Sequence, residues 1–152
     1  MKSRLVNNIN DLRTYVLIFS DGDEMKQGMM EFVKDEHIDG ASFTAIGAFS
    51  KATLGYFDVA KKDYHKFIID EQVEVLSLSG NVAFNVDHNR PQIHAHVVVG
   101  KKDGSAHGGH LFTGEVRPTL EVVVTETPRH LRRRIDVRSG LALIKLDDQQ
   151  RL

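Results

Sequence analysis

The sequence predicts an α+β fold: a largely antiparallel β-sheet with one main helix packed on a face, in a single compact domain over residues 1–152. Two observations predict this class. One early stretch has the apolar spacing of a helix, and a series of strands follows it in place of further helices. The length of 152 residues is typical of one domain, and 41% hydrophobic with 27% charged residues is an ordinary globular composition.

The first part of the chain contains the predicted helix. Residues 15–19 form a short apolar run, which is typical of a buried strand. Acidic residues and several N-cap candidates follow at 20–24. Apolar residues then recur every three or four positions from Met25 onward. The pattern therefore predicts an amphipathic helix that ends near Asp35, before Gly40.

Strands dominate the middle of the chain. Residues 41–49 are small and apolar, and 52–57 and 64–69 are typical of a strand pair joined by a polar turn. Residues 73–84 alternate between apolar and polar over a long stretch. A glycine inside such a strand, here Gly80, predicts a bulge or bend.

The last part of the chain continues this pattern. Residues 93–99, 111–116 and 120–125 predict three more strands, and 141–146 predict a final one. A second short helix is an alternative for residues 129–134.

Composition excludes several classes of function. The chain has no cysteine, which rules out disulfides, thiolate metal sites and a cysteine nucleophile. This fits a reducing compartment, so we expect a cytoplasmic location. We expect no signal peptide and no membrane association, because no apolar run approaches the roughly 20 residues of a membrane span. A net charge of −1 and a pI of about 6.7 give no overall basic footprint for nucleic acid.

The histidine pattern is the strongest indication of chemistry. Eight histidines are present, and four of them fall between His94 and His110. Residues two apart in a strand point the same way, so His94 and His96 lie side by side, opposite an apolar face that begins at Ile93. Their Cα atoms would be about 6.6 Å apart. That spacing allows two ring nitrogens to reach one ion at about 2.0–2.1 Å each.

A third histidine returns to the same place. The turn signal at 101–105 predicts that residues 108–112 run back antiparallel, with His110 opposite or nearly opposite His96. Three histidines with an open position are typical of a catalytic or ligand-binding zinc. We predict one divalent metal ion, zinc first, at His94, His96 and His110, open to a water or a small anionic ligand. The alternative is a set of half-buried strand histidines that bond to their neighbours.

The same region resembles a known family. The segments Pro91-x-x-His94-Ala95-His96, Gly108-Gly109-His110 and Pro118-Thr119-Leu120-Glu121 are similar to the prokaryotic form of the plant and prokaryote conserved (PPC) domain, and the resemblance covers nearly the whole chain. It implies an α+β fold with a large antiparallel sheet, a homotrimer, and a site where prokaryotic members can hold a metal by the matching histidines. It implies no known reaction.

The resemblance also raises DNA binding. In plants the domain follows AT-hook motifs with an Arg-Gly-Arg-Pro core, and this sequence has no such core. The one basic cluster, residues 129–134, is either a phosphate or nucleic-acid patch or a solvated face that pairs with Glu126 and Asp136. We expect no DNA binding by this chain alone, since the overall charge is slightly acidic.

Glu121 is the remaining candidate. It could orient a ligand histidine or act as a base near a metal-bound water. It could equally be a structural carboxylate bonded to a neighbouring strand or subunit.

Three hypotheses for function remain open at this point. The first is a small metal-dependent hydrolase, lyase or ligand sensor. The second is a DNA-binding or regulatory module without catalysis. The third is an oligomeric interaction module with structural histidines.

Overall fold

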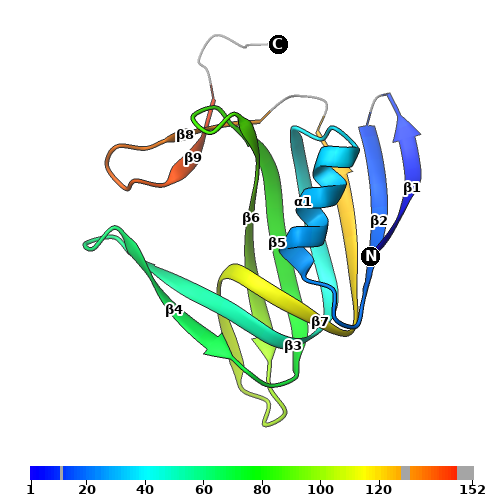
Figure 1. Ribbon diagram of the computed structural model, residues 1–152, viewed down its shortest axis with the longest axis vertical. Coiled ribbons are helices and arrows are strands. Elements are labelled where there is room, and N and C mark those ends of the chain that lie inside the picture. The colour runs from blue at the N-terminus through cyan, green and yellow to red at the C-terminus, as the bar shows by residue number, and fades with distance from the viewer. Residues whose placement is uncertain (11, 128–130, 147–152) are drawn as a thin grey trace.

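The computed structural model describes residues 1–10, 12–127 and 131–146. Within them the chain forms nine strands and one helix, which are connected mostly by short turns (Figure 1). In chain order they are β1 (Lys2–Ile9), β2 (Leu12–Ser20), α1 (Met25–Asp35), β3 (Gly40–Asp58), β4 (Asp63–Ile69), β5 (Val73–Asn85), β6 (Arg90–Gly100), β7 (Ala106–Glu126), β8 (Arg132–Ile135) and β9 (Ala142–Lys145).

The predicted α+β class is wrong. Strands hold 68% of the described residues and helix only 8%, so the structure is a large β-sheet with one short helix. The sheet is also mixed, because β8 runs parallel to β5 while the other pairings are antiparallel. The spacing of apolar residues located the helix correctly, but its 11 residues are a small part of the structure.

Two strands are much longer than expected. The predicted strands at 41–49 and 52–57 are parts of β3, which has 19 residues, and those at 111–116 and 120–125 are parts of β7, which has 21. Register shifts between the two strands allow them to bend without ending. Gly47 is one such place. Its φ is +146°, and a Cβ there would lie 2.3 Å from a backbone oxygen of β7.

The chain termini also differ from expectation. Residues 2–9 form an edge strand, β1, which was not among the predicted elements. The alternative of a second helix at 129–134 is wrong for the described part of that range. Arg132 to Arg134 belong to strand β8. Residues 129 and 130 lie outside the described residues.

Strand order explains how the sheet curves. The order is β1-β2-β7-β3-β5-β8-β9, with β4 added beside β3 and β6 placed between β5 and the first residues of β7. The strands β3, β5, β6 and β7 therefore form a closed circuit of hydrogen-bonded neighbours. In Figure 1, β4 and the β8–β9 hairpin extend to the left of the view, and β6 runs through the middle.

The core follows the predicted alternation. Ile93, Ala95, Val97 and Val99 of β6 are all buried, and His94 and His96 lie on the opposite face of this strand. The buried side of α1, which includes Met29 and Phe32, joins the same apolar cluster. In the described part of the chain, no helix combines the length and apolar character needed to cross a bilayer.

Candidate metal centre

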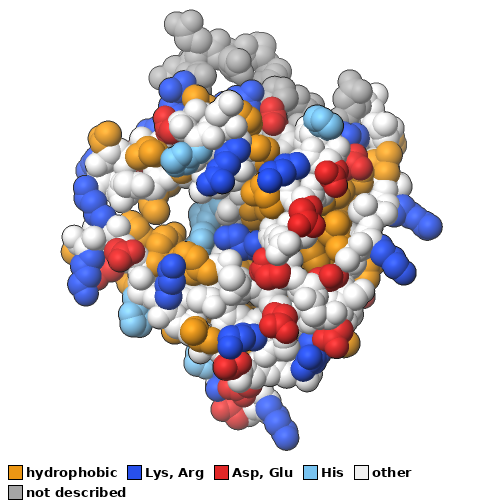
Figure 2. Space-filling model, viewed as in Figure 1, with side chains coloured by type: hydrophobic (Ala, Val, Ile, Leu, Met, Phe, Trp, Pro, Cys, Tyr) orange, Lys and Arg blue, Asp and Glu red, His pale blue; other side chains and the backbone are white. Residues whose placement is uncertain are grey.

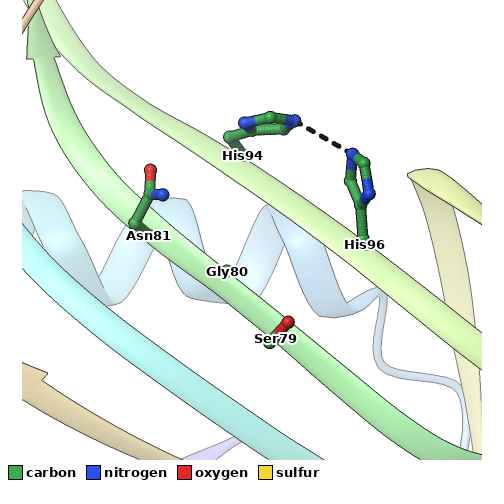
Figure 3. Close-up of a pocket in the computed structure, with 5 residues that line it drawn as sticks. All are labelled: Ser79, Gly80, Asn81, His94 and His96. Atoms are coloured by element: carbon green, nitrogen blue, oxygen red, sulfur yellow. Dashed lines mark hydrogen bonds between the residues drawn. The ribbon is translucent and has the colours of Figure 1, made fainter. Parts of the chain in front are cut away.

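Three histidines meet where β7 joins β6. His94 and His96 project from β6 on the face opposite its buried apolar residues, and Figure 3 shows both rings on the same side of the strand. The β6–β7 register pairs His96 directly with His110, as the turn signal at 101–105 predicts. The predicted return of the chain thus brings a third imidazole to the other two.

The ring nitrogens converge closely enough for one ion. A ligand atom from each of His94, His96 and His110 lies within 4.8 Å of the others. The Nε2 atoms of His94 and His96 are 3.2 Å apart. Two ligands of a tetrahedral zinc at about 2.0–2.1 Å would be separated by about 3.3–3.4 Å. The Nδ1 atom of His110 is buried and has no hydrogen-bond partner among the described residues. A nitrogen in that state suits a position beside an ion.

Glycines make this convergence sterically feasible. A Cβ at Gly80 of β5 would lie 2.5 Å from the carbonyl oxygen of His94, so any larger residue would push β6 away. A Cβ at Gly109 of β7 would lie 2.7 Å from the carbonyl oxygen of Gly55. The bulge expected at Gly80 lies instead between Val75 and Ser77. Gly80 allows strands β5 and β6 to approach each other closely.

Two aromatic side chains contact the third histidine, His110. The ring centroid of His110 lies 5.0 Å from that of Tyr64 and 4.9 Å from that of Phe112. Tyr64 and Phe112 also contact each other edge to face at 5.0 Å. Sequence reasoning missed both aromatic residues. Phe112 could have been found, because it lies two positions after His110 in a strand and so points to the same side.

Burial keeps two of the imidazoles neutral. It lowers the pKa of His94 to about 4, and the charge of Arg133 adds to this effect. Burial also lowers the pKa of His110 to about 4, with smaller contributions from His94 and Lys26. Both rings are therefore neutral at physiological pH. Only the neutral form of imidazole can ligate a metal.

The pocket beside the histidines has a volume of about 300 Å³ and is lined by Ser79, Gly80 and Asn81 of β5 together with His94 and His96 (Figure 3). Figure 2 shows a hollow in which histidine side chains are visible, with basic side chains near it.

Two cations that could not be selected from the sequence lie close to this pocket. Lys26 of α1 donates a hydrogen bond from Nζ to the carbonyl oxygen of Leu111, at 3.1 Å. Arg133 of β8 is only 3% exposed and donates to Oδ1 of Asn81. Both residues come from elements distant in sequence from the histidines, so only the fold could reveal them.

Glu121 lies elsewhere. It is exposed on β7 and pairs across the sheet with Ile18 on one side and Ile46 on the other. The three-histidine group does not include it. Its role beside a metal stays a prediction.

Two arginines of the basic cluster at residues 129–134 interact with other parts of the protein. Arg132 forms an ion pair with Asp39 at 3.6 Å and lies over the ring of Phe84, and Arg133 is buried. The partners expected from sequence are different, since Glu126 bonds to Arg13. Arg134 is exposed. Within the described residues, this pattern favours the structural interpretation over a nucleic-acid patch.

Comparisons with solved structures show what this chain resembles. A metal-containing protein from Archaeoglobus fulgidus is 34% identical with a TM-score of 0.81, and the alignment covers 95% of this chain and 97% of that one. A candidate DNA-binding protein from Ralstonia eutropha JMP134 is 31% identical with a TM-score of 0.80, covering 88% and 91%.

A curated relative resembles the chain in sequence. The bifunctional protein GlmU of Synechococcus sp. (strain JA-3-3Ab) is 30% identical over 118 residues, which is 76% of this chain. The chain spans only 17% of the length of that relative.

The family model of the Plants and Prokaryotes Conserved (PCC) domain matches residues 7–128. This match covers the strands that carry all three histidines and agrees with the resemblance seen in the sequence. The chain belongs to the Plants and Prokaryotes Conserved domain family.

Proposed function

We propose that this protein binds one divalent metal ion, zinc first, through His94, His96 and His110. The ion keeps an open position for a water or a small anionic ligand. The observation that carries the proposal is the convergence of three ring nitrogens within 4.8 Å of one another.

Three further observations support this proposal. The low pKa of about 4 for both His94 and His110 keeps these rings neutral at neutral pH, so one nitrogen of each ring carries no proton and can ligate a metal. The buried Nδ1 of His110, which finds no hydrogen-bond partner among the residues that the structure describes, suits an ion as its partner. The relative from Archaeoglobus fulgidus, 34% identical over nearly the whole chain, is a metal-containing protein.

The donor set determines what the ion could do. Three neutral imidazoles leave the double positive charge of the ion uncompensated. Such an ion attracts an anion or lowers the pKa of a bound water toward neutrality. A hydrolase, a lyase and a small-ligand sensor all use this property, and screening of metal-loaded protein against small anions distinguishes them.

Elemental analysis tests the proposal. The protein is purified without a histidine tag, and the metal content of the wild type is compared with that of His94→Ala and His110→Ala. We expect about one ion per chain in the wild type and a large loss in both variants. His107→Ala is the matched control, because His107 is exposed on β7 three residues before His110. Equal metal content in all four proteins would contradict the proposal.

A regulatory module without catalysis is the second candidate, and the candidate DNA-binding relative from Ralstonia eutropha favours it. The net charge of −1 and the internal use of Arg132 and Arg133 weigh against DNA binding by this chain alone. A homotrimer and a cytoplasmic location complete the proposal.

A further inference from the structure

Two fixed positive charges border the histidine cluster without belonging to it. Lys26 comes from the beginning of α1, and Arg133 comes from β8 near the end of the described chain. Neither residue can ligate a metal in its charged form. Their charges therefore need another explanation.

Lys26 is held beside the third histidine. Its Nζ atom bonds to the carbonyl oxygen of Leu111, the residue that follows His110 in β7. That partner is neutral and adds no negative charge to balance the ammonium. The charge of Glu24 acts on Lys26. The carboxylate oxygens of Glu24 accept hydrogen bonds from the backbone N–H groups of Gln27 and Gly114, at 2.7 and 2.9 Å. Glu24 is thus committed to capping α1 and to β7, and it offsets Lys26 only in part.

Arg133 is held at the other end of the cluster. Within the described residues, its guanidinium donates hydrogen bonds to two neutral groups, the carbonyl oxygen of Ala142 at 2.8 Å and Oδ1 of Asn81. Its Nε atom is buried without a partner in the described residues. Asn81 pairs with His94 across β5 and β6 and lines the pocket. A buried guanidinium without a carboxylate is energetically costly, and an anion in the adjoining pocket would relieve that cost.

The charges of the ion, Lys26 and Arg133 are all positive. With the proposed ion in place, the site holds a double positive charge on the metal and single positive charges on Lys26 and Arg133. Among the described residues, the group of side chains placed to hold the ion consists of three histidines and includes no carboxylate. The pocket volume of about 300 Å³ is at the lower end for small-molecule sites.

We propose that the ligand of this site is a small dicarboxylate, with one carboxylate on the metal and the second near Lys26. Arg133 contributes its charge through the pocket wall at Asn81. Two anionic groups are needed because the positive charge is divided between the ion and the side chains around it. This inference rests on the metal site proposed above and names its class of ligand.

The test compares anions on metal-loaded protein. Isothermal titration calorimetry measures the affinity of malonate, succinate and acetate for the zinc-loaded wild type and for Lys26→Met. We expect the better dicarboxylate to bind the wild type about tenfold or more tightly than acetate, since a bond to a charged group commonly contributes that much. In Lys26→Met we expect this preference to disappear while the zinc content stays the same.

Lys34→Met is the matched control, because Lys34 is exposed near the other end of the same helix. It should keep the preference of the wild type. Lys26→Gln retains a donor for the carbonyl oxygen of Leu111 and serves as a second variant if Lys26→Met does not fold. Zinc-loaded wild type that binds acetate as tightly as both dicarboxylates would overturn the inference and leave the metal site intact. An unchanged preference in a folded, zinc-loaded Lys26 variant would do the same. A wild type that holds no zinc would overturn the metal proposal and this inference together.

Discussion

His96 and His110 lie directly opposite each other on antiparallel strands β6 and β7, with ring centroids 5.6 Å apart. This pairing joins two segments separated by a turn and converts a His-x-His pattern into a three-nitrogen group. His94 completes the group, with its ring centroid 5.0 Å from those of both His96 and His110.

Metal-free protein should lose stability as the pH falls from about 6.5 to about 4. In the folded protein burial lowers the pKa of His94 and of His110 to about 4, below the ordinary histidine value of about 6.5, so the unfolded chain binds more protons in this range. Stability therefore rises with pH across the window and is fully present above it. Urea unfolding at several pH values measures this slope. A double variant, His94→Ala with His110→Ala, should have a shallower slope, and an identical slope would refute the assignment.

His96→Ala should lose metal and remain folded. His96 is exposed, and the buried face of β6 is untouched by the change. Surface substitutions of this kind usually alter stability by about 0.5 kcal/mol or less. Metal affinity should fall by more than the roughly 10–100-fold typical of losing a group that only orients a ligand. Thermal unfolding and zinc titration measure the two effects. A variant that fails to fold, together with a wild type that unfolds on chelation, would show a structural metal instead.

Gly80→Ala should weaken both the fold and the metal site. The added Cβ would lie 2.3 Å from the ring of Phe43 and 2.5 Å from the carbonyl oxygen of His94. Because the second contact is backbone, β6 must move, and overpacking of this kind costs about 1–3 kcal/mol. Ser77→Ala, at an exposed position of β5 that does not line the pocket, is the control. Chemical denaturation and zinc titration should show losses for Gly80→Ala only.

The protein should be a homotrimer. The family resemblance is the main basis for this prediction, and the outer sheet face supports it. On that face Ile18 and Ile46, which are 37% and 62% exposed, lie on either side of Glu121. Light scattering should give about three times the chain mass of 17.1 kDa, and Ile46→Lys should lower the trimer fraction. A wild-type mass near 17.1 kDa at micromolar concentration would count decisively against it.

This chain alone should not bind DNA sequence-specifically. Affinity for DNA comes largely from counterions released by several lysine or arginine contacts to phosphate. In the described residues, Arg132 is paired with Asp39 and Arg133 is buried, so the basic cluster has little free charge to offer. Gel-shift assays at physiological salt should show no discrete complex. A sub-micromolar, sequence-dependent complex would refute this prediction.

The local parts of the site were accessible from sequence. The alternation of His94 and His96 with buried residues fixes their shared face, and the turn at 101–105 fixes the return of His110. The fold class could not be predicted correctly in the same way. Short apolar runs separated by polar residues predict separate strands, whereas backbone bends at glycines such as Gly47 let β3 continue through them.

The surroundings of the site depend on long-range packing. Tyr64 of β4 contacts His110, whereas Lys26 of α1 and Arg133 of β8 bond to residues beside the histidines. No local pattern marks any of the three. The closed circuit of β3, β5, β6 and β7 brings these elements together, and the register that closes it is set by the whole sheet.

Zinc-edge X-ray absorption of the stoichiometric zinc complex tests the central claim most directly. It reports the ligand types and distances around the ion. We predict three imidazole nitrogens at about 2.0–2.1 Å with one further oxygen, and loss of an imidazole contribution in His110→Ala. A spectrum without imidazole scattering, or one unchanged in His110→Ala, would contradict the assignment of His94, His96 and His110 as the metal ligands.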